Sequence, residues 1–274
     1  MGEIKQLFWG NKITRPIINS ASYIKNVIWL MITFKSKAFW RRLKKDSPYR
    51  KLEEYKNKYK GKRCFIIATG PSLTESDVQK LKNEYTFGMN SVCLMMEKLG
   101  WNTTFYGIQD PYVYEKLQDK LLKSKDTQFF VSDLLYNNYQ CPANAIPFSL
   151  NYLNHRHSYK KLFTKFSDDV VKEVFDGYTI TYSLMQIAAY MGFSKIYLIG
   201  NDCNYSRDPT KQHFADFGHS DPNADFSGRR ILFAYEVARD FSMGKDFEIV
   251  NCTRGGALEL YRRANLDDVL AGKE

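Results

Sequence analysis

Short runs of apolar residues, each of strand length, recur along most of the chain and are separated by stretches with a helical pattern. The strand-length runs cover residues 63–68, 86–89, 104–108, 128–132, 195–200 and 247–251. Helical patterns lie between several of these runs, near residues 77–83, 182–192 and 227–243. Because strands that alternate with helices are typical of α/β proteins, the pattern predicts a Rossmann-like, open, mostly parallel sheet with helices on both faces.

The same pattern divides the chain near residue 60. Residues 61–274 contain the alternating elements, and their opening strand, glycine turn and helix indicate a nucleotide-binding catalytic domain. Within that domain, residues 133–178 are irregular and rich in aromatic residues, which predicts an inserted lid or acceptor-side subdomain. Residues 1–60 form an extension that ends in a polar, Lys-rich helical linker over residues 51–60.

The extension is both basic and amphipathic. Apolar residues recur in it at helical spacing, namely Ile17, Ala21, Ile24, Ile28 and Met31. Residues 1–60 hold 15 Lys and Arg but 4 Asp and Glu, which leaves 25 basic and 26 acidic residues for the main domain. A basic amphipathic helix is typical of contact with an anionic membrane surface, and we predict such contact through residues 1–45. The alternative is a helical arm packed on the domain or on a second subunit of a homo-oligomer.

Composition excludes several classes of protein. The chain has 274 residues, of which 44% are hydrophobic and 26% charged, which is ordinary for a globular protein and not for a disordered one. No apolar stretch reaches the roughly 18 residues of a membrane-spanning helix. The neutral main domain argues against a nucleic-acid partner. Five scattered cysteines without a C-x-x-C pair indicate free thiols of a reducing compartment, so we predict a cytoplasmic protein, peripheral at the inner face of the membrane.

Small, polar and turn-forming residues follow each of the main predicted strands. They are Thr69-Gly70-Pro71-Ser72, Asn90-Ser91, Gln109-Asp110, Asn201-Asp202-Cys203-Asn204-Tyr205 and Cys252-Thr253-Arg254-Gly255. Parallel sheets bind ligands outside the carboxyl ends of their strands, so these residues predict one common cleft. Gly70 would let the backbone approach a phosphate, and Ser72 would cap the helix that follows. Asp110, Asn204, His213, Arg254 and Gly255 are the further substrate-binding candidates of this edge.

The histidines suggest acid–base chemistry rather than a metal site. His213 and His219 lie in a loop after the strand that ends near residue 200, where an imidazole can reach a bound substrate. His155 and His157 fall in the irregular segment and are expected to be surface residues. No His or Cys spacing typical of a metal centre is present, although Asp110 and Asp202 could hold Mg²⁺, accept a hydrogen bond from a sugar hydroxyl or cap the next turn.

Several motifs of the main domain together resemble two bacterial families. They are Gly70-Pro71-Ser72-Leu73, Asn90, Thr179-Ile-Thr-Tyr-Ser183, the strand end from Tyr197 to Asp202, and Gly218-His219-Ser220. In this order they are similar to the lipooligosaccharide sialyltransferases of glycosyltransferase family 42. The same skeleton resembles the 6-hydroxymethylpterin diphosphokinase-like domain of surface-glycan and flagellar-glycosylation proteins. The resemblance covers residues 62–262 and leaves the extension out.

The sialyltransferase resemblance implies a GT-A-like variant of the fold. It also implies an inverting transfer of a sialic-acid-like sugar from a CMP donor to a glycan or lipid-linked acceptor of capsule, lipopolysaccharide or O-antigen. The implied nucleotide-binding residues are Thr69, Gly70, Pro71, Ser72, Asn90, Thr181, Tyr182, Ser183 and Asp202. His219 would be the general base, and no metal or other cofactor would be needed. The family places a tyrosine where this chain has Asn204, so Tyr205, one residue later, is the expected catalytic tyrosine.

Two other functions stay open on the residues alone. A diphosphokinase-like phosphotransferase would use ATP and Mg²⁺ held by Asp110 or Asp202. A non-catalytic protein of the same fold would bind the nucleotide without turnover.

Overall fold

The computed structural model describes residues 14–30, 32–33, 36–124, 126–156, 163–204, 214 and 224–274. Its main feature is an eight-stranded sheet in the order β10-β9-β8-β1-β2-β3-β4-β5, in which every neighbouring pair is parallel. The strands are β1 (Arg63–Ile67), β2 (Thr86–Met89), β3 (Phe105–Ile108), β4 (Gln128–Ser132), β5 (Ile146–Phe148), β8 (Lys195–Ile199), β9 (Glu248–Asn251) and β10 (Arg262–Arg263). The predicted Rossmann-like α/β sheet is confirmed.

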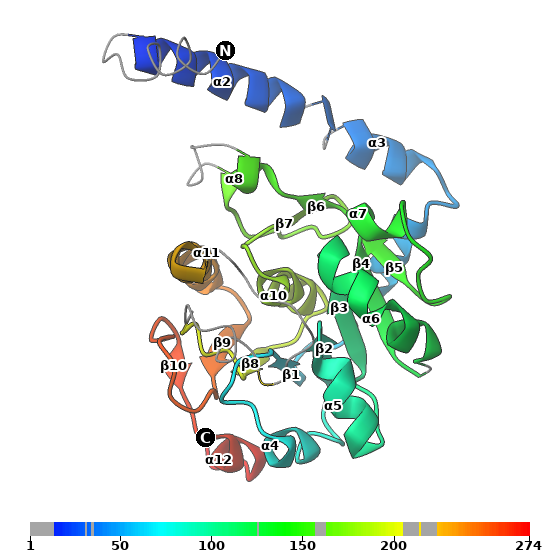
Figure 1. Ribbon diagram of the computed structural model, residues 1–274, viewed down its shortest axis with the longest axis vertical. Coiled ribbons are helices and arrows are strands. Elements are labelled where there is room, and N and C mark those ends of the chain that lie inside the picture. Colours follow the sequence, from blue (N-terminus) through cyan, green and yellow to red (C-terminus); the bar gives the residue numbers. More distant parts are fainter. Residues whose placement is uncertain are drawn as a thin grey trace.

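Helices cover both faces of this sheet (Figure 1). The crossovers that lead from β1 to β4 contain α4 (Glu75–Gln79), α5 (Val92–Leu99) and α6 (Pro111–Lys123) on one face, where α12 (Leu266–Leu270) also lies. The other face carries α10 (Ile180–Tyr190) and α11 (Ala224–Ser242). Because both faces are covered, the central strands are buried along nearly their whole length.

The strand order reverses next to β1. Strands β1 to β5 follow one another in one direction across the sheet, whereas β8, β9 and β10 continue from the opposite side of β1. The pairing of Ile67 with Ile199 brings the carboxyl ends of β1 and β8 to the same level. Such a switch in strand order is where open α/β sheets form a ligand crevice.

Residues 133–178 are more regular than their sequence suggests. They form α7 (Asp133–Tyr136), the edge strand β5, α8 (Leu153–Arg156) and a small parallel sheet of β6 (Leu150–Asn151) and β7 (Val174–Phe175). These elements are only two to four residues long, so no periodic pattern marks them. They are held by buried side chains such as Phe148, Leu150 and Val174.

Most of the described part of the extension is helical. Its helices are α2 (Thr14–Leu30), α3 (Ser36–Leu43) and the 3₁₀ helix η2 (Pro48–Tyr55), which overlaps the first half of the linker predicted over residues 51–60. In Figure 1, α2 and α3 run one after the other along one side of the molecule, beyond α8 and the small sheet. Among the described residues, no helix combines the length and apolar character needed to cross a membrane.

Candidate functional site

The turn after β1 packs directly against the turn after β8. The amide of Gly70 donates a hydrogen bond of 2.7 Å to the carbonyl oxygen of Gly200. The Ser72 hydroxyl donates to Oδ2 of Asp202 at 2.8 Å, and the Ser72 amide lies 3.4 Å from the same oxygen. Asp202 is itself buried. The two predicted nucleotide-binding turns therefore form one unit at the switch point, in which Asp202 holds the glycine turn in place.

The glycine at position 70 is required by this packing. A Cβ atom there would overlap with the carboxylate of Asp202 and lie 2.5 Å from the carbonyl oxygen of Gly200. Close approach of two backbone segments is a common reason for glycine in a tight turn. The sequence suggested that Gly70 lets the backbone approach a phosphate. The structure adds a second, steric reason for glycine at this position.

The first turn of α10 lies at the carboxyl ends of β2 and β3. Thr179 caps the helix by accepting a hydrogen bond from the Thr181 amide at 3.3 Å. The Thr181 hydroxyl contacts Sδ of Met89, the last residue of β2, at 3.4 Å. Ser183 donates to Oε1 of Gln109, which follows β3, at 2.7 Å. The positive end of the α10 dipole thus faces the same edge of the sheet as the glycine turn.

Tyr182 differs from its neighbours in α10. Its side chain is buried in the core, where the hydroxyl donates to the carbonyl oxygen of Lys165 at 2.9 Å and the ring stacks on Tyr235. Only the backbone of Tyr182 is therefore placed at the carboxyl edge.

Three buried polar atoms beside the glycine turn have no hydrogen-bond partner among the described residues. They are Oδ1 of Asn90 and Oγ of Ser91, after β2, and Nδ2 of Asn201, after β8. Asn90 also has a left-handed backbone, with φ of 46°. Leaving such a group unpaired destabilises a protein by about 1–3 kcal/mol, so unpaired atoms gathered on both sides of β1 indicate a place for a polar ligand or water.

A histidine–carboxylate pair lies at the same edge, further along the sheet. Nε2 of His155, in α8, is paired with Oδ2 of Asp176, which follows β7. Asp176 is buried and accepts hydrogen bonds from the Tyr178 amide at 3.0 Å and from Nε2 of Gln109 at 3.1 Å. Gln109 thereby connects this pair to Ser183 in α10.

The sequence placed His155 on the surface, and its side chain is indeed half exposed, but it is also oriented by a buried carboxylate. Its ring centroid lies 4.6 Å from that of Tyr178, whose own backbone is left-handed with φ of 66°. Strained backbone and an oriented imidazole are common at functional sites. No local motif could have revealed the pair, because α8 and the end of β7 meet only in the folded chain.

Asp110 and Asp202 do not come together as ligands. The Asp110 carboxylate is the N-cap of α6, accepting hydrogen bonds from the amides of Tyr112 at 2.8 Å and Val113 at 3.4 Å. The Asp202 carboxylate is occupied by Ser72, and β1 and β2 separate β8 from β3. Among the described residues no group of three or more His, Cys, Asp or Glu side chains could hold a metal ion. Among the described residues these two carboxylates therefore do not form one shared metal site.

Tyr205, His213 and His219 lie outside the described residues. The single described residue of their loop is Phe214, whose amide donates to the carbonyl oxygen of Thr69 at 3.0 Å. Phe214, the residue that follows His213, therefore contacts the glycine turn. Asn204, the last described residue before the loop, is exposed.

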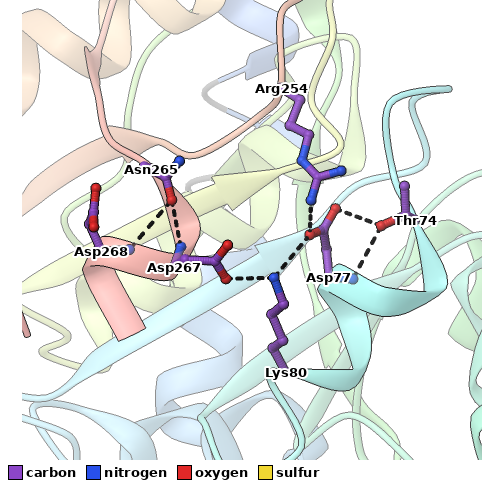
Figure 2. Close-up of polar contacts among 7 residues, drawn as sticks. All are labelled: Thr74, Asp77, Lys80, Arg254, Asn265, Asp267 and Asp268. Atoms are coloured by element: carbon purple, nitrogen blue, oxygen red, sulfur yellow. Dashed lines mark hydrogen bonds and ion pairs between the residues drawn. The ribbon is translucent and has the colours of Figure 1, made fainter. Parts of the chain in front are cut away.

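A cavity of about 150 Å³ opens on the other side of the glycine turn, between the ends of β1, β8, β9 and β10. Its wall includes Ser72 and Arg254, and beside Arg254 lies Gly255, with φ of 63°. The exposed Arg254 side chain pairs with the buried carboxylate of Asp77 in α4. Figure 2 shows Lys80 between Asp77 and Asp267, at 3.9 and 2.5 Å. These ion pairs connect α4, α12 and the loop after β9.

Asp77→Ala should lower the free energy of unfolding by about 1.5–3 kcal/mol, because it removes a buried acceptor of charged hydrogen bonds. Asp77 also accepts from the Thr74 hydroxyl at 2.7 Å and so secures the start of α4. Urea unfolding measures the loss. Glu259→Ala, which removes a solvent-exposed partner of Arg263, is the matched control and should change stability by less than about 0.5 kcal/mol. Equal effects of the two substitutions would contradict the structural role of Asp77.

The two cysteines near this edge, Cys203 and Cys252, have thiols that burial makes unreactive. Burial raises the pKa of the Cys203 thiol to about 12, with a further contribution from the Asp202 charge, and burial likewise raises the pKa of Cys252 to about 12. All five cysteines are free thiols. Since the thiolate is the nucleophile, neither residue suits covalent catalysis at neutral pH.

Comparison with known proteins identifies a family whose model matches this chain. The family described as "6-hydroxymethylpterin diphosphokinase MptE-like" matches residues 38–208, which is more than half of the chain and runs from α3 past the end of β8. A search of the curated proteins finds no match. Among solved structures, the MAf glycosyltransferase from Magnetospirillum magneticum AMB-1 is similar at 15% identity and a TM-score of 0.48, over 82% of this chain. The similarity spans 40% of the length of the MAf chain.

Proposed function

Because the chain belongs to the MptE-like family, we propose that it is a transferase that binds a nucleotide-activated donor at the carboxyl ends of β8, β1 and β2. The observation that carries this proposal is the set of unpaired polar atoms of Asn90, Ser91 and Asn201. They flank the glycine turn at the point where the strand order reverses, and a nucleotide offers the hydrogen-bond partners that they lack.

The surrounding elements suit a phosphorylated ligand. The positive end of the α10 dipole points to this edge, and the helix cap Thr179 is followed by the hydroxyls of Thr181 and Ser183. The glycine turn and Asp202 form the opposite side. We assign the phosphate to the start of α10 and the nucleoside to the side of Asn90 and Asn201.

We propose that the reaction is the inverting transfer of a sugar to an acceptor hydroxyl in the synthesis of a surface glycan. The resemblance of the motifs to family 42 sialyltransferases supports a CMP-linked, sialic-acid-like donor and a glycan or lipid-linked acceptor. In this scheme His219 takes the acceptor proton as the sugar–phosphate bond breaks, and Tyr205 donates to the departing phosphate. The proposal is supported by the contact of Phe214, which lies between these two residues in sequence, with Thr69 of the glycine turn.

A phosphotransferase that uses ATP and Mg²⁺ is the second candidate, and the description of the family favours it. The arrangement of Asp110 and Asp202 counts against it, because one caps a helix and the other binds Ser72. A non-catalytic nucleotide-binding protein would share the binding site but show no turnover.

The proposal is tested by thermal unfolding with CMP, CDP, UDP, GDP or ATP, each in Mg²⁺ and in EDTA. A ligand at 100 times its Kd stabilises the folded state by about 2.7 kcal/mol, so binding is visible as a shift in Tm. We expect CMP to raise the Tm equally in both conditions. An ATP response that disappears in EDTA would favour the phosphotransferase, and no response to any nucleotide would overturn the proposal.

A matched pair of variants locates the site in the same experiment. Asn201→Ala should lose most of the CMP response, since it removes the unpaired Nδ2 atom beside the glycine turn. Asn138→Ala, at an exposed position after α7, should keep the full response. Equal responses in both variants would show that the nucleotide binds elsewhere.

A further inference from the structure

Helix α2 presents its apolar side to solvent. Ile17, Ile24 and Ile28 are 65%, 57% and 52% exposed, although each is a residue type that is usually buried. Their spacing places them on one face of the helix. An amphipathic helix of a globular protein normally turns such a stripe toward the core, so this orientation calls for a partner.

The opposite face of α2 holds the helix to the domain. Asn26 is 4% exposed, and Trp29 packs against the buried pair Leu153 and Phe163. Asn26 lies half a helical turn away from the isoleucine stripe. The packing of Trp29 on the domain therefore determines the direction in which the isoleucine stripe faces.

Helix α3 also exposes large apolar side chains. Phe39, Trp40 and Leu43 are each more than half exposed. Exposed lysines accompany them, namely Lys37, Lys44 and Lys45. An open cavity of about 600 Å³ lies between Trp40, these lysines and residues of α7. Aromatic residues beside lysines are typical of segments at the boundary between lipid headgroups and acyl chains.

The positive charge of the extension indicates which partner binds the exposed apolar residues of α2 and α3. Residues 1–60 hold 15 basic and 4 acidic residues, whereas the rest of the chain is nearly neutral. A second copy would bring a surface of the same positive charge, and the two would repel each other. We propose that α2 and α3 dock on an anionic lipid bilayer, with the isoleucine stripe and the α3 aromatics at the acyl boundary and the lysines at the headgroups.

The docked orientation has a consequence for the acceptor, which rests on the proposed function. The short helix α8 contacts α2 through Leu153 and carries His155, the partner of Asp176. The bilayer would therefore lie on the side of the molecule that holds the His155–Asp176 pair. This arrangement favours an acceptor that is itself anchored in the membrane.

The test is flotation of the full chain with vesicles of phosphatidylglycerol and phosphatidylcholine, compared with phosphatidylcholine alone. We expect binding only to the anionic vesicles, weakened by added salt because exposed charges are screened. The variant Ile17→Ser, Ile24→Ser, Ile28→Ser should bind at least tenfold more weakly, with a nearly unchanged Tm because all three side chains are more than half exposed. Tyr85→Ser with Met243→Ser, two exposed apolar residues outside the extension, is the control and should bind as the wild type does.

Two results would overturn the proposal. One is equal vesicle binding by the triple variant and the wild type. The other is a stable dimer in sedimentation velocity that the triple variant dissociates, without vesicle binding by the wild type, which would make a second copy the occupant. The nucleotide-induced change in Tm is measured in parallel, so that failure of the proposed function is seen separately from failure of membrane docking.

Discussion

Gly70→Ala should abolish nucleotide binding and lower the free energy of unfolding by about 3 kcal/mol, in the upper part of the range for overpacked sites. The added methyl group would meet the Asp202 carboxylate and the carbonyl oxygen of Gly200, so the turn after β1 must move away from the turn after β8. That movement would also break the Ser72–Asp202 hydrogen bond. Urea unfolding and the CMP-induced change in Tm measure the two effects.

Two further variants test whether backbone packing at Gly70 causes the loss of stability and of nucleotide binding. Gly244→Ala introduces a methyl group at a positive φ with open space around it, and should destabilise by about 1–2 kcal/mol without affecting CMP binding. Adding Asp202→Ala to Gly70→Ala should not restore stability, because the carbonyl oxygen of Gly200 remains 2.5 Å from the new Cβ. Restored stability in this double variant would contradict the claim that backbone packing requires the glycine.

His219→Ala should lower sugar transfer by about 10²–10⁴-fold, the usual contribution of general base catalysis, and leave CMP binding nearly intact. In the proposed reaction His219 removes the proton from the acceptor hydroxyl and does not hold the donor nucleotide. Initial rates of transfer and the CMP-induced change in Tm separate these two properties. His213→Ala, in the same loop, is the matched control, with an expected loss of less than about tenfold because it transfers no proton.

The His155–Asp176 pair is the alternative source of a general base, and variants of the two residues test it. His155→Ala and Asp176→Asn should each leave more than a tenth of the transfer rate if His219 is the base. The reverse pattern, full activity in His219→Ala and a loss of about 10²-fold or more in His155→Ala, would make the Asp176-oriented imidazole of His155 the base.

The six strands that the apolar runs predict lie where the structure has β1, β2, β3, β4, β8 and β9. Parallel strands covered on both faces are continuously apolar, so each one is readable from its own residues. The two strands at the edges of the sheet could not be read in this way. β10 consists of two exposed arginines, and β5 is a three-residue run interrupted by Pro147, so both are formed by pairing with a neighbour rather than by their own pattern.

The candidate site was predictable as a set of positions but not as a set of contacts. Gly70, Asn90, Thr181 and Asp202 each follow a predicted strand or open a predicted helix, and parallel topology gathers such positions at one edge. Nothing local indicates that Asp202 binds Ser72, which is 130 residues away in sequence, whereas a turn cap was among the roles that the sequence offered for Asp110, and Asp110 does cap α6. Those side chains were predicted as ligands of the substrate, and the structure shows what they bind within the protein.

By itself the sequence determined the parallel sheet, the edge at which ligands are expected and the amphipathic, basic character of the extension, because each depends on residues close together in the chain. Only the tertiary structure decided which of these residues touch and in which direction they face. Helical periodicity places Ile17, Ile24 and Ile28 on one side of α2, but the packing of Trp29 on Leu153 and Phe163 turns that side to solvent. The pairing of His155 with Asp176 is likewise a contact between distant segments, which no local pattern encodes.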